Sequence, residues 1–484
     1  MTDTRAWLRR DFLKSAAATG LASWLPAARA GTGKLALPGG RVVVRSDHAY
    51  EEWRRGMPWQ MVKPGRFPAV IAQPTTTAEV AQSVQFARRN GLKVATKSGG
   101  HNVWANFLRD DGLLLDLSRL RDLSLDVEGR RAEAGPSIWA QSLIAQTLPH
   151  GLGFPVAHCA TVPLGGFLLG GGFGLNGDQW GTMSCFAVQG AEVVTADGEV
   201  IDIDANRHAE LFWALRGAGN GFPGVVTRFR LQLFEAPRKV ISSTYLFPGA
   251  RMAEVARLAG DLAADGPAHT EILGIAAIGG QDASGGNSVI CALRLANFSP
   301  DPAEGRATLE AMAGHPLTAE AMAKWELIET GWHEMFLESI DARRGFGFGR
   351  YAVDNLWTSR PAEVMTLLAE RLAASPSPLA HAVMQFKVRT DLPAEAALSR
   401  VAPAYCGLYS VWREEAGDSG SVGWLRNAMA QARELADGFY INEIDAEAHP
   451  ESVQGSFTPA AWRRLDDLRQ RVDRDGVFEG FFGA

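Results

Sequence analysis

The sequence predicts an α+β protein, and three observations support this fold class. Between Ala69 and Phe234, short apolar runs of strand length alternate with helical stretches. From about residue 238 to 437, strand-like apolar runs and helices return in a second region. No strand is followed by a Gly-x-Gly-x-x-Gly turn that opens a helix, which disfavours the doubly wound dinucleotide-binding fold.

The elements of the first region follow from local patterns. Ala69-Val70-Ile71-Ala72 is typical of a buried strand, and residues 77–90 form a helical pattern that starts at a threonine and ends before Gly91. Residues 92–96 predict the next strand, which leads directly into a glycine-rich turn. The other expected elements are strands at 113–117 and 225–233, a helix at 138–147, and a hairpin over 188–203 that turns at Asp197-Gly198.

The second region begins after a boundary at Glu235-Ala236-Pro237. We expect one antiparallel sheet with helices on one of its faces. Its predicted strands are 272–278, 288–295, 382–388 and 405–412, and its predicted helices are 252–264 and 362–373.

Two glycine-rich turns carry the strongest chemical signal. Residues 95–102 read Ala-Thr-Lys-Ser-Gly-Gly-His-Asn, and residues 159–174 begin with a cysteine and contain Gly165-Gly166 and Gly170-Gly171-Gly172. Glycines allow a backbone to approach a phosphate closely, and they let successive N–H groups converge on an anion. Each turn also sets one reactive side chain beside the glycines, His101 in the first and Cys159 in the second, which plain turns do not explain.

These residues resemble the berberine-bridge-enzyme-like branch of the vanillyl-alcohol-oxidase (PCMH-type) flavoproteins. The similarity runs from about Arg66 to Phe234 and resumes near the C-terminus. Besides the two turns, it includes residues 74–80, 194–198 and 211–217, and Tyr440-Ile441-Asn442. The resemblance implies a PCMH-type FAD-binding domain at 31–237, a substrate-binding domain at 238–437, and a segment at 438–484 that returns to the FAD domain.

The resemblance also implies the cofactor and the residues that bind it. FAD would be attached covalently through His101, at the 8α-methyl group, and through Cys159, at C6. A turn-capping histidine and a buried thiol are the simpler alternatives for these two residues. The expected FAD contacts are Lys97, Ser98, Gly99, Gly100, His101 and Asn102 in the first turn; Cys159, Thr161, Val162, Gly165, Gly166, Gly170, Gly171, Gly172 and Gly174 in the second; and Val225 and Asn442. No metal site is expected.

The reaction that such a protein catalyses needs a base, because a carbon that gives up a hydride from C–OH must also lose the hydroxyl proton. The resemblance places Tyr440 in this role. A tyrosine with an ordinary pKa of about 10 is a weak base at neutral pH. Gln385 and Lys387 alternate on the predicted strand 382–388 and could face the flavin, where Lys387 would stabilise a tyrosinate. An exposed lysine and a core tyrosine are the alternatives.

Several positions depart from the family pattern and leave the pocket and the base open. Pro163 stands where a glycine is usual, and Glu443 replaces the second tyrosine of the C-terminal motif. Val162 lies three residues after Cys159, and a small side chain there leaves room for dioxygen. The valine therefore favours an oxidase, although it is also a common residue for packing a strand.

Three functions remain open on this basis. The first is an FAD-dependent oxidase that removes a hydride from a C–OH or C–N centre of a small organic or carbohydrate substrate and passes the electrons to O₂, giving H₂O₂. The second is a dehydrogenase with another acceptor, and the third is a flavin-binding protein without turnover. The net charge of −6 gives no reason to expect nucleic acid as a partner. No Gly-x-Ser-x-Gly elbow, Walker loop or zinc-protease motif is present.

The N-terminal residues 1–30 predict a twin-arginine signal peptide. Arg9-Arg10 precedes a short apolar run at 15–25, and Ala28-Arg29-Ala30 follows it. We therefore expect a bacterial protein that is exported folded by the twin-arginine machinery to the periplasm or the medium, without membrane insertion. A plain helix with a chance Arg-Arg pair is the alternative. The other three cysteines, Cys185, Cys291 and Cys406, are expected to be small buried residues rather than parts of a disulfide framework.

Overall fold

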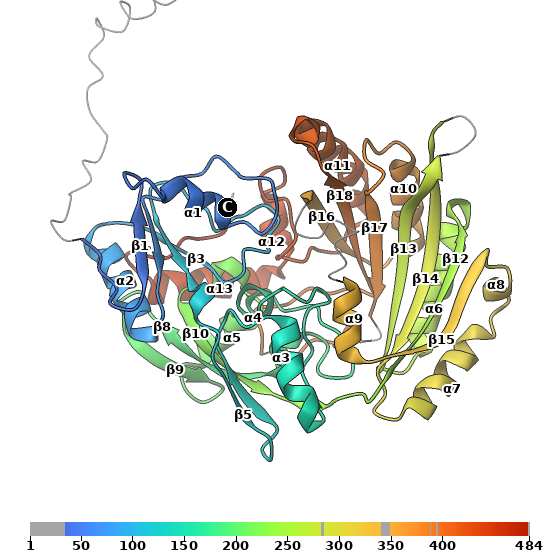
Figure 1. Cartoon of the computed structure of the whole chain (residues 1–484), viewed down its shortest axis with the longest axis horizontal. Coiled ribbons are helices and arrows are strands. Elements are labelled where there is room, and N and C mark those ends of the chain that lie inside the picture. The colour runs from blue at the N-terminus through green and yellow to red at the C-terminus, as the bar shows by residue number, and fades with distance from the viewer. Residues whose placement is uncertain (1–33, 282–284, 340–348, 388, 394, 483–484) are drawn as a thin grey trace, which may run out of the picture. The chain divides into compact units, whose positions relative to one another are not determined.

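The computed structural model describes residues 34–281, 285–339, 349–387, 389–393 and 395–482, with only the backbone of 336–339. The described chain contains three main sheets, two in its first half and one in its second (Figure 1). The predicted signal segment 1–30 lies outside the described residues, as does Val388 of the predicted strand 382–388.

The first sheet leads into the first glycine turn. Its strand order is β1-β2-β4-β3, with β2, β4 and β3 parallel and β1 antiparallel to β2. Helix α2 begins after Thr76, whose side chain accepts a hydrogen bond from the N–H of Glu79, as the sequence predicts for a threonine at that end. The elements are β1 Arg41–Val44, α1 Tyr50–Gly56, β2 Val70–Gln73, α2 Thr77–Arg89, β3 Val94–Lys97 and β4 Leu113–Asp116.

The second sheet is antiparallel and has the order β5-β6-β10-β8-β9. It includes the predicted hairpin, β8 and β9, in whose turn Gly198 has a φ of +77°. Its elements and those attached to it are β5 Leu123–Asp126, β6 Arg131–Ala134, α3 Ala140–Thr147, β7 Leu152–Gly153, α4 Leu164–Leu169, β8 Val188–Val194, β9 Val200–Asp204, α5 Ala209–Leu215, β10 Val225–Gln232 and β11 Phe234–Glu235.

The third sheet has seven antiparallel strands in the order β15-β12-β14-β13-β17-β18-β16. Its elements are β12 Val240–Pro248, α6 Met252–Asp265, β13 Thr270–Gln281, β14 Asn287–Asn297, α7 Pro302–Ala313, α8 Pro316–Ala319, β15 Ala323–Thr330, α9 Trp332–Ser339, β16 Arg350–Thr358, α10 Pro361–Ala373, β17 His381–Phe386, β18 Ala404–Trp412 and α11 Asp418–Ala432.

The two faces of this sheet differ in chemistry. On one face Ile272, Met384 and Cys406 join the hydrophobic core formed with α6, α10 and α11. Side chains alternate between the faces along a strand, so the register that aligns Gln385 with Tyr405 places both on the opposite face. That face therefore carries polar and aromatic side chains, and Tyr405 packs there in a cluster with Met183 and Tyr440 from outside the sheet. We call it the tyrosine face.

The C-terminal segment lies among the elements of the first half, where α13 is drawn in red between blue and green elements (Figure 1). Val94 of β3 forms an isolated parallel bridge with Phe478. Leu465 and Leu468 of α13 belong to the same core as α4 and β10. The last two helices are α12 Glu451–Gly455 and α13 Pro459–Val472. The exact domain limits stay a prediction.

The structure confirms the predicted α+β class and the antiparallel sheet covered by helices. One detail differs, because β17 ends at Phe386 and Lys387 lies just after the strand. There the N–H of Lys387 donates to the carbonyl of Pro403, outside the ladder to β13. The sequence reading also omitted β12, β15 and β16 of the same sheet.

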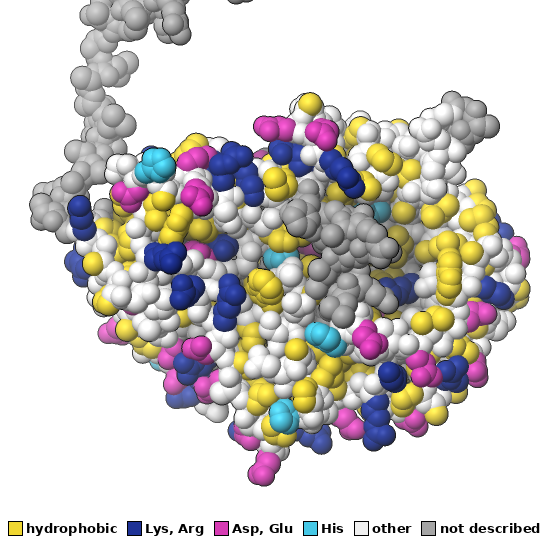
Figure 2. Space-filling view, viewed as in Figure 1, with side chains coloured by type: hydrophobic (Ala, Val, Ile, Leu, Met, Phe, Trp, Pro, Cys, Tyr) yellow, Lys and Arg dark blue, Asp and Glu magenta, His cyan; other side chains and the backbone are white. Residues whose placement is uncertain are grey.

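The surface and the cysteines agree with the composition. Acidic and basic side chains are interspersed over the face in Figure 2 rather than gathered into a single patch. Among the described residues, no helix is both long and apolar enough to span a bilayer. Cys185, Cys291 and Cys406 are free and buried, as predicted, whereas Cys159 is partly exposed.

Candidate active site

The two glycine turns lie directly against each other. A Cβ on Gly99 would lie 2.5 Å from ring carbons of Pro163, and a Cβ on Gly165 would lie 2.8 Å from Ser98 Oγ. Gly100 has a φ of +75°, a conformation that other residues rarely adopt. Glycine is therefore required here by close approach and by backbone geometry, and the turns form one structural unit.

The turns bring His101 and Cys159 together through a shared neighbour. The Thr161 hydroxyl lies 3.2 Å from His101 Nε2 and 3.6 Å from Cys159 Sγ. The indole of Trp59 stacks on the His101 ring, with 4.8 Å between the centroids and 27° between the planes. Two reactive side chains that are far apart in the sequence thus lie on either side of one threonine.

Burial lowers the pKa of His101 to about 4, and the nearby charge of Lys97 acts in the same direction. The imidazole is therefore neutral at physiological pH, the form in which a ring nitrogen can act as a nucleophile. Lys97 itself does not reach into open space, because its ammonium group forms a buried ion pair of 2.9 Å with Asp116.

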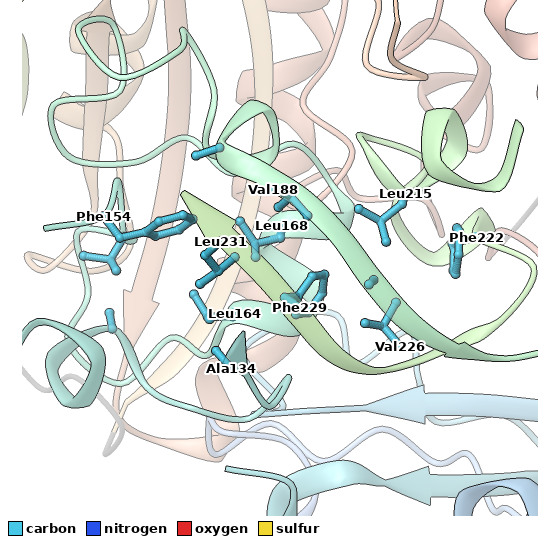
Figure 3. Close-up of a cluster of buried hydrophobic side chains, with 14 of the residues drawn as sticks. Ala134, Phe154, Leu164, Leu168, Val188, Leu215, Phe222, Val226, Phe229 and Leu231 are labelled. Atoms are coloured by element: carbon cyan, nitrogen blue, oxygen red, sulfur yellow. The ribbon is translucent and has the colours of Figure 1, made fainter. Parts of the chain in front are cut away.

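Helix α4 fixes the second turn to the protein core. Leu164 and Leu168 point from this helix toward Phe229 and Leu231 of β10, and all four side chains are buried (Figure 3). The opposite side of α4 is different, since Gly166 is exposed and a Cβ there would meet no atom within 4 Å. The helix is thus held on its apolar side and open at its glycine.

The Tyr440–Glu443 segment connects the glycine turns to the tyrosine face. Asn102 Nδ2 donates to the carbonyl of Asn442 at 3.2 Å, and a Cβ on Gly170 would collide with the Asn442 amide. On the other side, Asn355 of β16 binds the backbone of Tyr440 twice, accepting from its N–H at 2.8 Å and donating to its carbonyl at 3.0 Å.

Tyr440 is buried, and its hydroxyl oxygen accepts two hydrogen bonds. The donors are Asn442 Nδ2 at 3.0 Å and the N–H of Phe173 at 3.3 Å. Burial nevertheless raises the pKa of Tyr440 well above its ordinary value, and the negative charge of Glu443 raises it further. The role of Tyr440 as base stays a prediction, and its electrostatic surroundings oppose the tyrosinate that this role requires.

Gln385 is buried on the tyrosine face, and whether it faces the flavin stays a prediction; the ammonium group of Lys387 lies among other partners. It pairs with Asp178 and donates to the carbonyl of Thr182 at 2.6 Å. It also lies 5.1 Å from the ring centroid of Phe173. Burial lowers the pKa of Lys387. Its described contacts therefore hold the segment from Phe173 to Thr182 against the sheet.

A carboxylate cluster on the tyrosine face was not predicted from the sequence. Glu443 accepts hydrogen bonds from the hydroxyls of Tyr405 and Tyr409, the latter at 2.9 Å. Nearby, Glu271 accepts from the N–H of Asn176 at 2.9 Å and lies 3.3 Å from His158 Nε2. His158 directly precedes Cys159 in the chain, so the cluster lies close to the glycine turns.

The remaining predicted cofactor residues lie in two different surroundings. Val162 is partly buried beside Cys159, with its N–H donating to the cysteine carbonyl at 3.2 Å. Gly171 and Gly172 have φ values of +105° and +76°, and Gly174 lies against Pro155 and Ser184. Val225 is buried at the start of β10 in the core of the first sheet.

Comparison with known proteins agrees with this arrangement. A family model described as an FAD binding domain matches residues 68–204. The FAD-linked oxidoreductase janO of Penicillium janthinellum is 27% identical over 431 residues, which span 88% of this chain and 92% of that protein. Several other curated relatives are matched over less than half of their own length.

Two solved structures share the fold. 6-Hydroxy-D-nicotine oxidase from Arthrobacter nicotinovorans is similar with a TM-score of 0.78 at 22% identity, covering 93% of this chain and 98% of that chain. A variant of berberine bridge enzyme described as a reticuline dehydrogenase has a TM-score of 0.78 at 17% identity, covering 92% of this chain and 96% of that chain. The chain is an FAD-dependent oxidoreductase that shares the fold of berberine bridge enzyme.

The residues of this oxidoreductase fit FAD. In the first turn, the backbone N–H groups of Gly99, Gly100 and His101 donate to no acceptor among the described residues, which leaves them available to an anion. In the second turn, Gly166 is exposed, and a Cβ there would meet no protein atom, which leaves space on that side of α4. The His101 imidazole and the Cys159 thiol, both beside Thr161, would supply the nucleophiles if FAD is attached covalently.

The site residues of the carboxylate cluster were not predicted from the sequence, because their local signals are weak. His158 could have been noticed, because it directly precedes Cys159. Glu443 was noticed as a departure from the family pattern but was given no role. Tyr405, Tyr409 and Glu271 lie on two strands that are adjacent only through β17, and no sequence spacing predicts that they share a face.

Proposed function

We propose that this oxidoreductase is an oxidase with a doubly attached FAD, which takes a hydride from a C–OH or C–N centre of a small molecule and is reoxidised by O₂. The observation that carries the proposal is the meeting of His101 and Cys159 at the Thr161 hydroxyl. When bound, FAD supplies the electron acceptor for the hydride.

The residues of the chain would perform the other parts of the reaction. The two glycine turns would hold the cofactor through backbone N–H groups, and the tyrosine face would orient the substrate through Gln385 and the tyrosine hydroxyls. The pair formed by Lys387 and Asp178 would keep the segment that carries Phe173 in place. A carbon that loses a hydride also needs a group that receives the proton from its oxygen or nitrogen.

The attachment is tested with the full-length protein and three variants, His101→Ala, Cys159→Ala and the double variant. Each is precipitated with acid, and the flavin absorption of pellet and supernatant is recorded. Flavin retained in the pellet of the wild type and of both single variants, but released from the double variant, supports two bonds. Flavin that the wild type releases completely contradicts the proposal.

A dehydrogenase with another electron acceptor is the second candidate, since this fold is shared by an enzyme named as an oxidase and by one named as a dehydrogenase. The small side chain of Val162 beside Cys159 favours the oxidase. The two are separated without knowledge of the substrate. Dithionite-reduced protein is mixed with air-saturated buffer, and the return of flavin absorption is timed. Fast return in the wild type that slows in Val162→Leu supports the oxidase; slow return in both supports the dehydrogenase.

We also propose that residues 1–30 direct export of the folded protein by the twin-arginine route, because paired arginines precede a short apolar run. Expression of the full chain in a bacterium, followed by cell fractionation, tests this proposal. Replacing Arg9 and Arg10 by lysine should retain the protein in the cytoplasm. Equal export of both forms would contradict it.

A further inference from the structure

We propose that Glu443 is the group that receives the substrate's proton, in the position that the sequence assigns to Tyr440. The inference rests on the proposed function and adds a catalytic residue to it. Three observations support it: the position of the Glu443 carboxylate, the hydrogen bonds that hold this carboxylate, and the two hydrogen bonds that the hydroxyl of its neighbour Tyr440 already accepts.

The position of Glu443 follows from a turn. Its N–H donates to the carbonyl of Tyr440 at 3.1 Å, so the ends of the Tyr440–Glu443 segment come together. The segment is held by Asn102 of the first glycine turn on one side and by Asn355 of β16 on the other. Glu443 is thereby fixed between the cofactor turns and the tyrosine face, where a substrate must lie to reach both.

The carboxylate is held by one oxygen and open at the other. Both tyrosine hydroxyls, those of Tyr405 and Tyr409, donate to Oε2. Oε1 has no hydrogen-bond partner among the described residues. It is not among the buried side-chain atoms that lack a partner, and the Glu443 side chain is partly exposed. A carboxylate with one oxygen anchored and the other accessible has the arrangement that a proton acceptor needs.

The groups around Glu443 favour it over Tyr440 in this role. Burial raises the pKa of the Glu443 carboxyl above its ordinary value, toward the working range of a general base, while Tyr405, Tyr409 and His158 moderate the rise. The same negative charge raises the pKa values of Tyr405, Tyr409 and Tyr440. The tyrosines therefore stay protonated and act as donors.

The other charged and titratable groups that face the cluster come from four elements or segments. His158 lies in the segment before Cys159, and Glu271 on β13 binds it. His381 on β17 stacks on Tyr409, with 5.1 Å between the ring centroids. Lys387, after β17, is paired with Asp178 and so adds little net charge. Of these groups, His158 is the one whose charge lowers the pKa of Glu443.

The chemical step balances with this assignment. The O–H or N–H bond of the substrate breaks, and its proton forms a new bond to Oε1 of Glu443. The electron pair left on the oxygen or nitrogen forms the double bond to carbon as the carbon gives its hydride to the FAD oxidant of the proposed function. Glu443 then releases the proton to solvent when the product leaves. Tyr405 and Tyr409 are positioning residues in this step.

The test compares full-length, flavin-loaded wild type with Glu443→Gln, Tyr440→Phe and Glu434→Gln. Glu434 is exposed in the preceding stretch of the chain and serves as a matched Glu→Gln control. A panel of small amines and the alcohols of the same carbon skeletons is screened for anaerobic bleaching of wild-type flavin. The fastest compound becomes the probe, and its bleaching rate is measured against pH.

We expect Glu443→Gln to slow flavin reduction by about 10²–10⁴-fold and to remove the acid limb of the pH profile. Tyr440→Phe should change the rate by less than about tenfold, and Glu434→Gln should match the wild type. Tyr409→Phe removes a donor that lowers the pKa of Glu443, so its acid limb should move to higher pH. A Glu443→Gln rate within about tenfold of wild type, or a larger loss in Tyr440→Phe, would overturn the inference.

A second readout decides the matter if no compound of the panel bleaches the flavin. The visible absorption of the oxidised flavin is followed against pH, since a nearby change of charge perturbs it. A transition present in the wild type and Tyr440→Phe but absent from Glu443→Gln supports the inference. A flat wild-type profile, or a transition that survives in Glu443→Gln, contradicts it. Wild-type protein without bound flavin would instead refute the proposed function, and this inference with it.

Discussion

Two buried lysine–aspartate pairs, one beside the first glycine turn and one at the tyrosine face, have unlike surroundings. Lys97 and Asp116 have side-chain exposures of 9% and 2%. They lie on β3 and β4, two neighbouring strands of the first sheet. Lys387 and Asp178 have exposures of 1% and 11% and join the two halves of the chain. Asp116 also accepts from Gln73 at 2.7 Å and from the Ser118 hydroxyl at 2.9 Å.

The difference shows how the same ion pair can serve two purposes. If Lys97 is lost, Asp116 still accepts hydrogen bonds from Gln73 and Ser118. The Lys97–Asp116 pair is therefore a local support for the first glycine turn. The second pair also involves the Thr182 carbonyl and fixes a long segment of the first half to the sheet of the second. Breaking a buried pair is costly because it leaves one charge buried without its counter-ion.

The largest expected effect is that of Lys387→Met. It removes the cation from a buried carboxylate and a donor from the Thr182 carbonyl, so we expect a loss of about 3–5 kcal/mol in the free energy of unfolding. Urea denaturation measures this loss. The double variant Lys387→Met with Asp178→Asn should recover part of it, because no unpaired charge remains. A single-variant loss below about 1 kcal/mol would show that the pair does not join the halves as described.

Lys97→Met should cost less, about 1–3 kcal/mol, since Asp116 keeps its bonds to Gln73 and Ser118. The variant also removes a positive charge that lowers the pKa of His101, so the pKa of the imidazole should rise. Denaturation and NMR titration of the histidine in flavin-free protein give the two values. A loss equal to that of Lys387→Met would remove the distinction between the pairs.

A matched pair of glycine variants separates packing from cofactor binding. In Gly170→Ala the new methyl group collides with the Asn442 amide, and we expect a loss of about 1–3 kcal/mol together with reduced flavin content. In Gly166→Ala the methyl group meets no protein atom, so the fold should be unchanged or slightly more stable. Reduced flavin content in Gly166→Ala, with unaltered unfolding, is the expected sign of a methyl group in the cofactor's place.

The smallest expected effect concerns pH. A histidine with a pKa of about 4 stays neutral where an ordinary one, with a pKa of about 6.5, is already half protonated. Covalent incorporation of FAD into flavin-free protein should therefore be nearly constant from about pH 8 to about pH 5.5 and fall by half near pH 4. Acid-precipitated flavin measures the incorporation. A midpoint near pH 6.5 would place His101 in a more hydrated environment than described.

Much of the first half of the chain could be predicted from the sequence, because the residues that determine each of its elements are contiguous. The strand that leads into His101, the helix that begins after Thr76 and the hairpin that turns at Gly198 each depend on neighbouring residues. The meeting of His101 with Cys159 was inferred from resemblance rather than from spacing. The structure shows why the two side chains meet, because both lie within reach of the Thr161 hydroxyl, and this contact depends on how the two turns pack together.

The second half of the chain was less predictable for a physical reason. Tyr405 and Gln385 share a face because of strand register, and Glu443 reaches them from a segment outside the sheet. A pairing of this kind is set by packing over the whole sheet rather than by local preference. Lys387 shows the same limit, since its partners Asp178 and Thr182 come from the other half of the chain.

The return of the C-terminal segment to the first half has a consequence for biosynthesis. Val94 of β3 bonds with Val477 and Glu479, and the core around α4 includes Leu465 and Phe481. During translation, β3 can pair with β4 early, but its other edge stays unpaired until residues 477–479 have left the ribosome. The core around α4 is complete only after α13 has been made, so the nascent chain cannot finish its flavin site before then.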